Sequence, residues 1–178
     1  MGSAKNRGSS ASGSVVMHRA VPRLTAASLA RFVTRAQRAI GLRGETHIVV
    51  GGNRLLRELN RRFRKKNRST DVLSFPPALA GGAGLAGDLA ISAELAAANA
   101  RRLGHGTAEE VKILALHGLL HLAGYDHERD RGEMAREEQR LRRRLGLPAG
   151  LIERHSRVAI ANHRRPPQRP SASSAEAL

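Results

Sequence analysis

LALHGLLHLAGYDH, residues 114–127, is the stretch from which the rest of the sequence is best interpreted. His117 and His121 are four apart, and a helix stacks such residues on one face, one turn apart. Gly124 is typical of the position just after a helix, and a turn there can return His127 to the same point. Three neutral imidazoles with one open position favour a catalytic metal site. The alternative, packed histidines, is weaker because three of eight histidines fall within eleven residues of an apolar run.

Outward from this motif, hydrophobic periodicity predicts one α+β domain of the α/β type over residues 15–155. We expect a mixed sheet of about four strands packed with about five helices, with the histidine-motif helix central and a zincin-like metal site. The expected strands cover residues 15–21, 46–50, 71–75 and 88–91, and the expected helices begin near residues 25, 53, 93, 107 and 130. Asn53 and the Thr107–Glu110 capping-box pattern are the expected helix starts.

The two ends are expected to be disordered tails, residues 1–14 and 156–178, because they are too polar to bury a core. No apolar run is long enough for a membrane span, and the first residues lack the apolar stretch of a secretory signal. We therefore expect a cytoplasmic protein without a membrane partner. The absence of cysteine excludes disulfides, thiol nucleophiles and cysteine-based zinc fingers.

The formal net charge of +16 comes mostly from arginine, which suits phosphate recognition. Eight of the fifteen residues 54–68 are Arg or Lys against one acid, Glu58, so we expect this helix to hold a polyanion. The arginines of the last helix are offset by nearby glutamates and are expected to form intrahelical ion pairs on a solvated face. Only four aromatic residues are present, which argues against binding by stacking platforms. The residues of the basic segment predicted to contact this polyanion are Arg61, Arg62, Lys66 and Arg68.

Gly118 occupies the position at which H-E-x-x-H metalloproteases carry their general base. Glycine cannot take a proton, so hydrolysis of peptides or amides by that mechanism is disfavoured. A metal that lowers the pKa of water, beside arginines that stabilise phosphate charge, favours phosphodiester cleavage instead. Asp126 is expected either to orient a histidine or to cap the turn after Gly124, and both readings stay open. Asp71 and Asp126 are weak candidates for a general base.

The sequence resembles the YbeY family of bacterial endoribonucleases, the rRNA maturation factors. The family's H-G-x-L-H-L-x-G-Y-D-H run is present at residues 117–127, its R-x-x-D-x-P-T-D-V-L-S-F-P block near residues 64–76, and its G-D-[IL] strand at residues 87–89. An acidic-then-Met pattern follows at Glu128, Asp130, Glu133 and Met134. Asn67 and Ser69 depart from the usual Asp and Pro, which puts the rigidity of that loop in doubt because proline would fix φ.

The resemblance implies one zinc ion per chain held by His117, His121 and His127, with Arg64 as the catalytic arginine acting on the RNA phosphate. It also implies that Thr70, Asp71, Ser74 and Phe75 lie on a strand lining the cleft. Nickel, iron and copper also suit three imidazoles.

The implied activity is single-strand-specific endoribonuclease action in 16S rRNA 3′-end maturation and ribosome quality control. The implied partners are single-stranded rRNA, the small ribosomal subunit and other ribosome-processing proteins. Water and the RNA 2′-OH both stay open as the nucleophile. The rival hypotheses are a non-catalytic RNA-binding assembly factor with a structural metal and, less favoured, a metallopeptidase or amidohydrolase.

Overall fold

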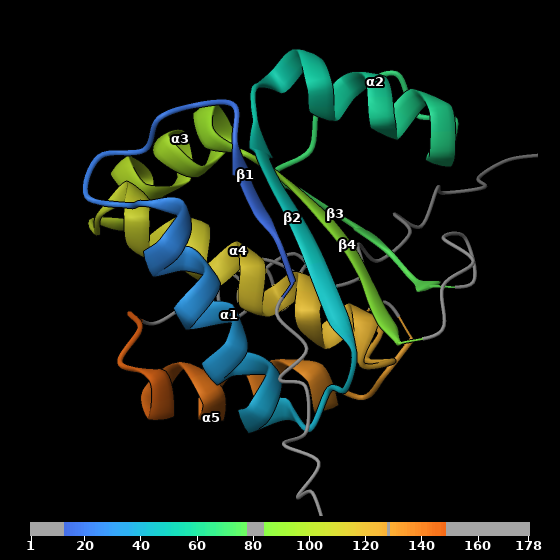
Figure 1. Ribbon diagram of the computed structural model, residues 1–178, viewed down its shortest axis with the longest axis vertical. Helices are drawn as coiled ribbons and strands as arrows, with labels where there is room; N and C mark the ends of the chain where they lie inside the picture. Colours follow the sequence, from blue (N-terminus) through green and yellow to red (C-terminus); the bar gives the residue numbers. More distant parts are fainter. Residues whose placement is uncertain (1–12, 78–83, 128, 149–178) are drawn as a thin grey trace, which may run out of the picture.

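The structure, a computed structural model, describes residues 13–77, 84–127 and 129–148. These residues form an α+β fold in which five helices pack on a four-stranded mixed sheet, as the sequence predicts (Figure 1). The elements are β1 (Val15–Met17), α1 (Ala26–Ile40), β2 (Glu45–Gly51), α2 (Asn53–Arg64), β3 (Val72–Phe75), β4 (Leu85–Ser92), α3 (Ala93–Leu103), α4 (Thr107–Leu122) and α5 (Glu133–Leu145).

The strands lie in the order β1-β2-β4-β3, so β4 is inserted between two strands that precede it in the chain. β1 pairs with β2, and β2 with β4, in parallel, whereas β3 runs antiparallel to β4. The two edge strands are therefore β1 and β3. This order matters for the site because β3 forms one boundary of the sheet, with Ser74 facing α4 on one side and Leu73 facing α2 on the other.

Two cores of unequal size lie on opposite faces of the sheet. Ile48 of β2 and Leu89 of β4 belong to the larger core, to which α1, α3, α4 and α5 contribute. Successive strand residues point to opposite faces, so Ala90 and Leu73 join Leu56 of α2 in a small second core. Figure 1 shows α2 by itself on that second side. The fold thus places the histidine-motif helix and the basic helix on opposite faces of one sheet.

The largest differences from the predicted strand boundaries are at the end of β1 and the start of β4. β1 ends at Met17, and Val21 instead forms an isolated bridge with Leu24. β4 begins at Leu85, three residues before the expected start, because Glu45 of β2 pairs with Leu85. The carbonyl of Ser14, assigned by sequence to the N-terminal tail, accepts the N–H of Ile48 at 2.8 Å, so ordered pairing reaches this residue.

Helix starts differ as well, for local hydrogen-bonding reasons. Gly52, not Asn53, caps α2, because the Asn53 side chain accepts a hydrogen bond from Ser92 at 2.6 Å. The N-cap of α4 is Gly106, one residue earlier than predicted, and the Glu109 carboxylate accepts the Gly106 N–H at 2.8 Å; glycine has no side chain to complete a capping box. α5 begins at Glu133 instead of residue 130. Asp130 lies before the helix, where its carboxylate accepts the N–H groups of residues 132 and 134.

The predicted C-terminal tail, residues 156–178, lies outside the described residues, as do residues 1–12 of the predicted N-terminal tail. No helix among the described segments combines the length and apolar character that crossing a bilayer requires.

Candidate metal centre

α4 presents His117 and His121 on a half-buried side of an otherwise buried helix. Between them Gly118 faces the sheet: a Cβ there would lie 2.7 Å from the Leu89 side chain and 3.2 Å from Ser74 Oγ. The Ser74 hydroxyl donates to the Gly118 carbonyl at 3.3 Å, which fixes this close approach. A glutamate at position 118 would point into the sheet, so the position cannot supply the base of a metalloprotease.

The turn after α4 closes with the hydrogen bonds of a Schellman motif. Gly124 has φ +94°, its N–H donates to the His121 carbonyl at 3.0 Å, and the Tyr125 N–H donates to Leu120 at 3.1 Å. The chain then reverses, and His127 comes to face the other two histidines. Ring centroids are 4.8 Å apart for His117–His121, 5.3 Å for His117–His127 and 5.1 Å for His121–His127. One ligand atom from each ring lies within 4.8 Å of the others.

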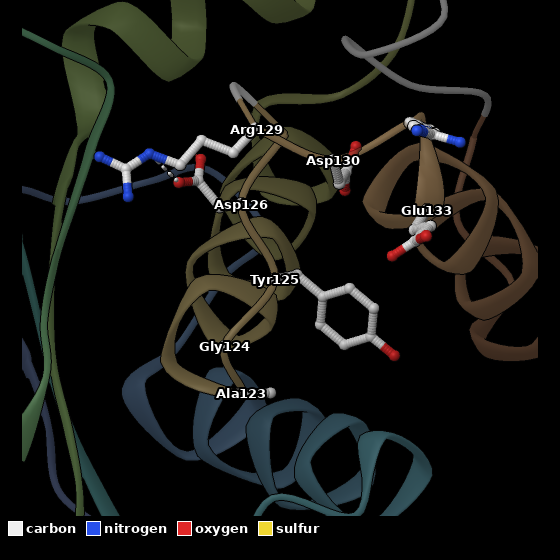
Figure 2. A pocket seen from close by; sticks show the side chains of 8 residues that line it. Ala123, Gly124, Tyr125, Asp126, Arg129, Asp130 and Glu133 are labelled. Atoms are coloured by element: carbon white, nitrogen blue, oxygen red, sulfur yellow. Dashed lines mark ion pairs between the residues drawn. The ribbon is translucent and has the colours of Figure 1, made fainter.

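An open hollow of about 710 Å³ lies beside this turn, lined by residues 123–126, 129–131 and 133 (Figure 2). The Asp126 carboxylate in its wall lies 3.5 Å from Nε of Arg129, and the Asp126 carbonyl accepts the N–H groups of residues 129 and 130. The backbone carbonyl of Asp126 thus closes the turn that follows it, and its side chain faces Arg129. The negative charge of Asp126 also raises the pKa of His121, although this is the smallest of the effects on that ring.

The hydrogen bonds to the outer ring nitrogens determine which nitrogen of each histidine is free. His117 Nδ1 lies 2.9 Å from a Glu138 carboxylate oxygen, and His121 Nδ1 lies 3.0 Å from the Tyr125 carbonyl. Both partners are acceptors, so in the neutral rings each Nδ1 carries the proton and each Nε2 carries a lone pair. The two Nε2 atoms face each other at 3.1 Å. Two lone pairs in that position repel each other unless a cation or a proton lies between them.

The donor set fits a metal ion. Two nitrogens held at 2.0–2.1 Å from one tetrahedral zinc ion would be about 3.4 Å apart, close to the observed separation. Burial, together with the neighbouring charges of His117 and His127, lowers the pKa of His121 to about 4. His121 is therefore neutral at physiological pH, which is the form that binds a metal.

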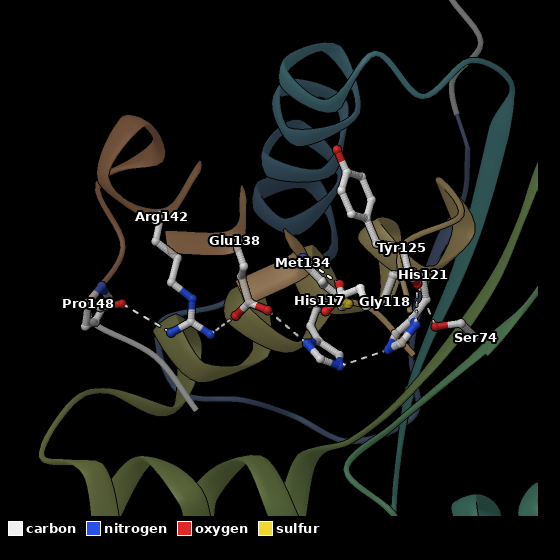
Figure 3. Close-up of polar contacts among 10 residues, drawn as sticks. Ser74, His117, Gly118, His121, Tyr125, Met134, Glu138, Arg142 and Pro148 are labelled. Carbon is white, nitrogen blue, oxygen red and sulfur yellow. Dashed lines mark hydrogen bonds and ion pairs between the residues drawn. The ribbon is translucent and has the colours of Figure 1, made fainter. Parts of the chain in front are cut away.

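Glu138 and Arg142 of α5 extend the centre into the core, a feature that the sequence did not reveal. The Glu138 side chain is 2% exposed and joins His117 to the guanidinium of Arg142, which is 4% exposed (Figure 3). Burial by itself would raise the pKa of Glu138, but the His117 hydrogen bond and the Arg142 charge together hold it below its ordinary value. A carboxylate on the far nitrogen of a ligand histidine fixes the ring's orientation and tautomer.

The basic segment is fixed at its end but makes no described ion pairs. Lys65 adopts φ +58° and its N–H closes α2 on the Asn60 carbonyl, while the Asn60 amide donates to the Arg68 carbonyl at 2.7 Å. Arg64, the last residue of α2, is exposed. A second hollow of about 360 Å³ is lined by Arg54, Arg57, Glu58, Arg61 and Asn67. No acid among the described residues pairs with any cation of this segment, so its positive charge is available to a partner.

The residues expected to line a cleft do not converge on one point. Ser74 faces α4 through its bond to Gly118, whereas Phe75 belongs to the small core on the α2 side. Asp71 lies at the opposite end of β3 from Phe75, where one carboxylate oxygen accepts the Val72 N–H at 3.0 Å and the other lies 3.4 Å from the Asn99 amide. Thr70 precedes it, with its hydroxyl 3.4 Å from the Asp71 carboxylate. Asp71 thus ties β3 to α3.

Comparisons with known proteins identify the family to which the sequence is similar. The family model described as Endoribonuclease YbeY matches residues 15–146. A protein named Endoribonuclease YbeY from Koribacter versatilis is 48% identical over 145 residues, covering 82% of this chain and 93% of its own. One of the same name from Solibacter usitatus is 51% identical over 141 residues, covering 79% of this chain and 93% of its own. The solution structure of TM1509 from Thermotoga maritima covers 87% of this chain and 99% of its own, with 21% identity and a TM-score of 0.49.

Proposed function

The chain belongs to the YbeY family of endoribonucleases, and on this premise we propose that it cuts single-stranded RNA with one zinc ion held by His117, His121 and His127. The observation that carries the proposal is the pair of Nε2 atoms facing each other at 3.1 Å, with both Nδ1 protons already committed to acceptors. That arrangement suits a cation. When bound, zinc supplies Lewis acidity for phosphodiester cleavage.

The protein's own groups have separate roles in this proposal. Glu138 accepts a hydrogen bond from the Nδ1–H of His117 and so keeps the Nε2 lone pair directed inward, and the Tyr125 carbonyl does the same for His121. Arg64 neutralises charge that develops on the phosphate oxygens, a task for which an exposed guanidinium without a described partner is suited. Arg61, Arg62, Lys66 and Arg68 bind the neighbouring phosphates. The nucleophile is identified by the products, since only 2′-OH attack leaves a 2′,3′-cyclic phosphate.

The proposed substrate is ribosomal RNA. We propose that the chain matures the 3′ end of 16S rRNA and acts in ribosome quality control, in the cytoplasm, on the small ribosomal subunit and beside other processing proteins. The unpaired cations of α2 support a substrate with a dense phosphate backbone, because such cations give salt-sensitive and sequence-independent affinity. Because the chain belongs to a family of endoribonucleases, we propose that this phosphate backbone is that of RNA.

Two substitutions test the catalytic assignment. His121→Ala should lose both the metal and RNA cleavage, whereas Arg64→Glu should keep a full metal content and lose cleavage. His18→Ala, which removes an exposed histidine from outside the centre, is the matched control and should change neither. Metal content is measured by elemental analysis and cleavage on a labelled single-stranded RNA.

The same experiment distinguishes the rival hypothesis. Cleavage that survives both substitutions in a highly purified preparation would belong to a contaminant, and a non-catalytic RNA-binding assembly factor would then be the better description. Metal content well below one ion per chain, with no effect of chelation on cleavage, would also contradict the proposal.

A further inference from the structure

Phe63 is a half-exposed aromatic residue on the side of α2 that faces the sheet, and its exposure requires an explanation. Among the described residues only Val16 and Phe63 are large hydrophobic side chains with such exposure, at 47% and 49%. Phe63 follows Leu56 by seven residues and Leu59 by four, so it lies on the side of α2 that faces the sheet. Leu56 is fully buried there. Phe63 continues the same side of the helix but stays half exposed, near the end of β3.

Phe75 holds the Phe63 ring in place from beneath. The two ring centroids are 5.1 Å apart with planes at 69°, an edge-to-face contact. Phe75 is the last residue of β3, pairs with Asp88 of β4 and packs on the small core with Leu56. A ring supported in this way has a fixed orientation, so little conformational entropy is lost when a flat ligand stacks on it.

Positive charge lies beside the exposed ring. The guanidinium carbon of Arg62 lies 5.5 Å from the Phe63 ring centroid, and no described acid pairs with Arg62 or with its basic neighbours on α2. The guanidinium is itself a flat group, so the ring accepts a flat partner at that position. A protein-binding hot spot would sit within a wider apolar patch, whereas here one ring is set among cations. An aromatic ring with cations beside it matches a nucleobase with its phosphates.

The ring also lies on the same boundary of the sheet as the metal centre. Ser74 contacts the histidine-motif helix through the Gly118 carbonyl, and the next residue, Phe75, points to the opposite face toward Phe63. The edge strand β3 therefore separates the two sites. In Figure 1 the C-terminal ends of α2 and α4 both extend toward this β3 edge. A single strand of RNA that bends around the edge would reach both.

We propose that Phe63, supported by Phe75, is a stacking site for one unpaired base of the RNA substrate. The inference rests on the proposed endoribonuclease function and deepens it, because only unpaired RNA has a base free to stack. The site recognises the π face that every base has, so binding does not depend on which base is stacked. It also gives single-strand preference a physical cause that the arginines lack, since phosphate charge is present in both single and double strands.

Binding measurements with two short oligonucleotides test the stacking site. One is an oligoadenylate, and the other is an abasic oligomer of the same length and phosphate charge. Phe63→Ala should weaken binding of the oligoadenylate by about 5- to 100-fold, the usual value of one stacked base, and leave binding of the abasic oligomer unchanged. The factor should be the same at low and high salt. Val16→Ala, which removes an equally exposed side chain on β1 at the opposite edge of the sheet, is the matched control and should have no effect.

A second variant reads the contact directly. The chain contains no tryptophan, so Phe63→Trp introduces a single indole, whose fluorescence the oligoadenylate should quench and the abasic oligomer should not. Val16→Trp should respond to neither. Equal binding of the oligoadenylate by wild type and Phe63→Ala, or an equal loss for both oligomers, would overturn the stacking site.

The outcome is separate from that of the proposed function. Binding that depends on Phe63 in a protein that fails to cleave RNA would leave the stacking site standing and remove the catalytic proposal. Cleavage by the wild type with no dependence of binding on Phe63 would do the reverse. A wild-type protein that binds neither oligomer would overturn both.

Discussion

α2 and α5 are both arginine-rich, yet they use arginine in opposite ways. In α5, Arg140 pairs with Glu137 and Arg142 pairs with Glu138, each within one turn of the helix. In α2 the single acid, Glu58, forms no described ion pair, and the cations remain exposed. Two of the five arginines of α5 are paired with glutamates at i−3 or i−4, and the Glu138–Arg142 pair is buried. In α2, Glu58 has the same spacing from Arg61 and Arg62 but forms no described ion pair with either. The comparison teaches that burial of a paired glutamate, more than arginine content or the spacing of acids, distinguishes a helix whose arginine packs in the core from one whose cations stay at the surface.

Burial sharpens the contrast within α5 itself. Arg140 is half exposed, whereas Arg142 and Glu138 are almost fully buried. An exposed pair contributes little to stability, but removing one member of a buried pair leaves an unpaired charge in the core. Glu138 also holds His117. One of the two ion pairs of α5 is therefore part of the metal centre, and the other is a surface feature.

The largest expected effect comes from Glu138→Ala. Without the carboxylate, Arg142 is left buried and unpaired, which should lower the free energy of unfolding by about 3–5 kcal/mol. Loss of the His117 hydrogen bond should weaken zinc binding by about 10- to 100-fold. Unfolding in urea with a chelator present, followed by circular dichroism, measures the first effect. Competition with a chromophoric chelator measures the second.

A double variant separates the two consequences. Glu138→Ala with Arg142→Met removes the stranded charge and should recover most of the stability but none of the zinc affinity. An unchanged urea midpoint in Glu138→Ala, or zinc affinity restored by the double variant, would contradict the role assigned to Glu138.

The next largest effect, on the salt dependence of oligonucleotide binding, is expected from substitutions in α2. Arg57→Gln with Arg61→Gln removes two cations that line the smaller hollow. The slope of log binding constant against log salt for a single-stranded oligonucleotide should become shallower by about 1.4. Stability and zinc content should not change. Arg143→Gln with Arg144→Gln makes the same charge change in the last turn of α5 and should leave the slope nearly intact. Equal changes of slope for the two pairs would mean that net charge, not the α2 surface, binds RNA.

The smallest effect is expected at Glu137. The hydrogen bond from Arg140 lowers the pKa of Glu137 below its ordinary 4.5. A carboxyl group with a lowered folded-state pKa stabilises the fold above its unfolded pKa, and this contribution disappears as pH falls through the folded value. The difference in Tm between wild type and Glu137→Gln should therefore be small at neutral pH and vanish in acid. A difference that grows toward acid pH would show that the pair does not stabilise the fold.

Most of the fold class was predictable because its signals are local. The helical repeat of α1 and α4 and the β-branched run of β2 identify elements from a few neighbouring residues. The predicted start of β4 was wrong because pairing with β2, and not the composition of β4 itself, extends the strand to Leu85. Aromatic scarcity suggested that base stacking was unimportant, but composition cannot show that Phe63 and Phe75 meet across two elements.

The sequence by itself determined the three histidines of the candidate metal site, since His117, His121 and His127 lie on one helix and its closing turn, where spacing sets geometry. Only the tertiary structure decided what holds and surrounds them. Glu138 is 21 residues from His117, and the packing of α5 on α4 brings them together. Ser74 and Phe75 point to opposite faces because they are adjacent in a strand, but the elements that they meet there, α4 and α2, depend on the packing of the helices on the sheet. The physical reason is that hydrogen bonds within a helical turn follow from residue spacing, whereas contacts between elements form only when the hydrophobic cores assemble.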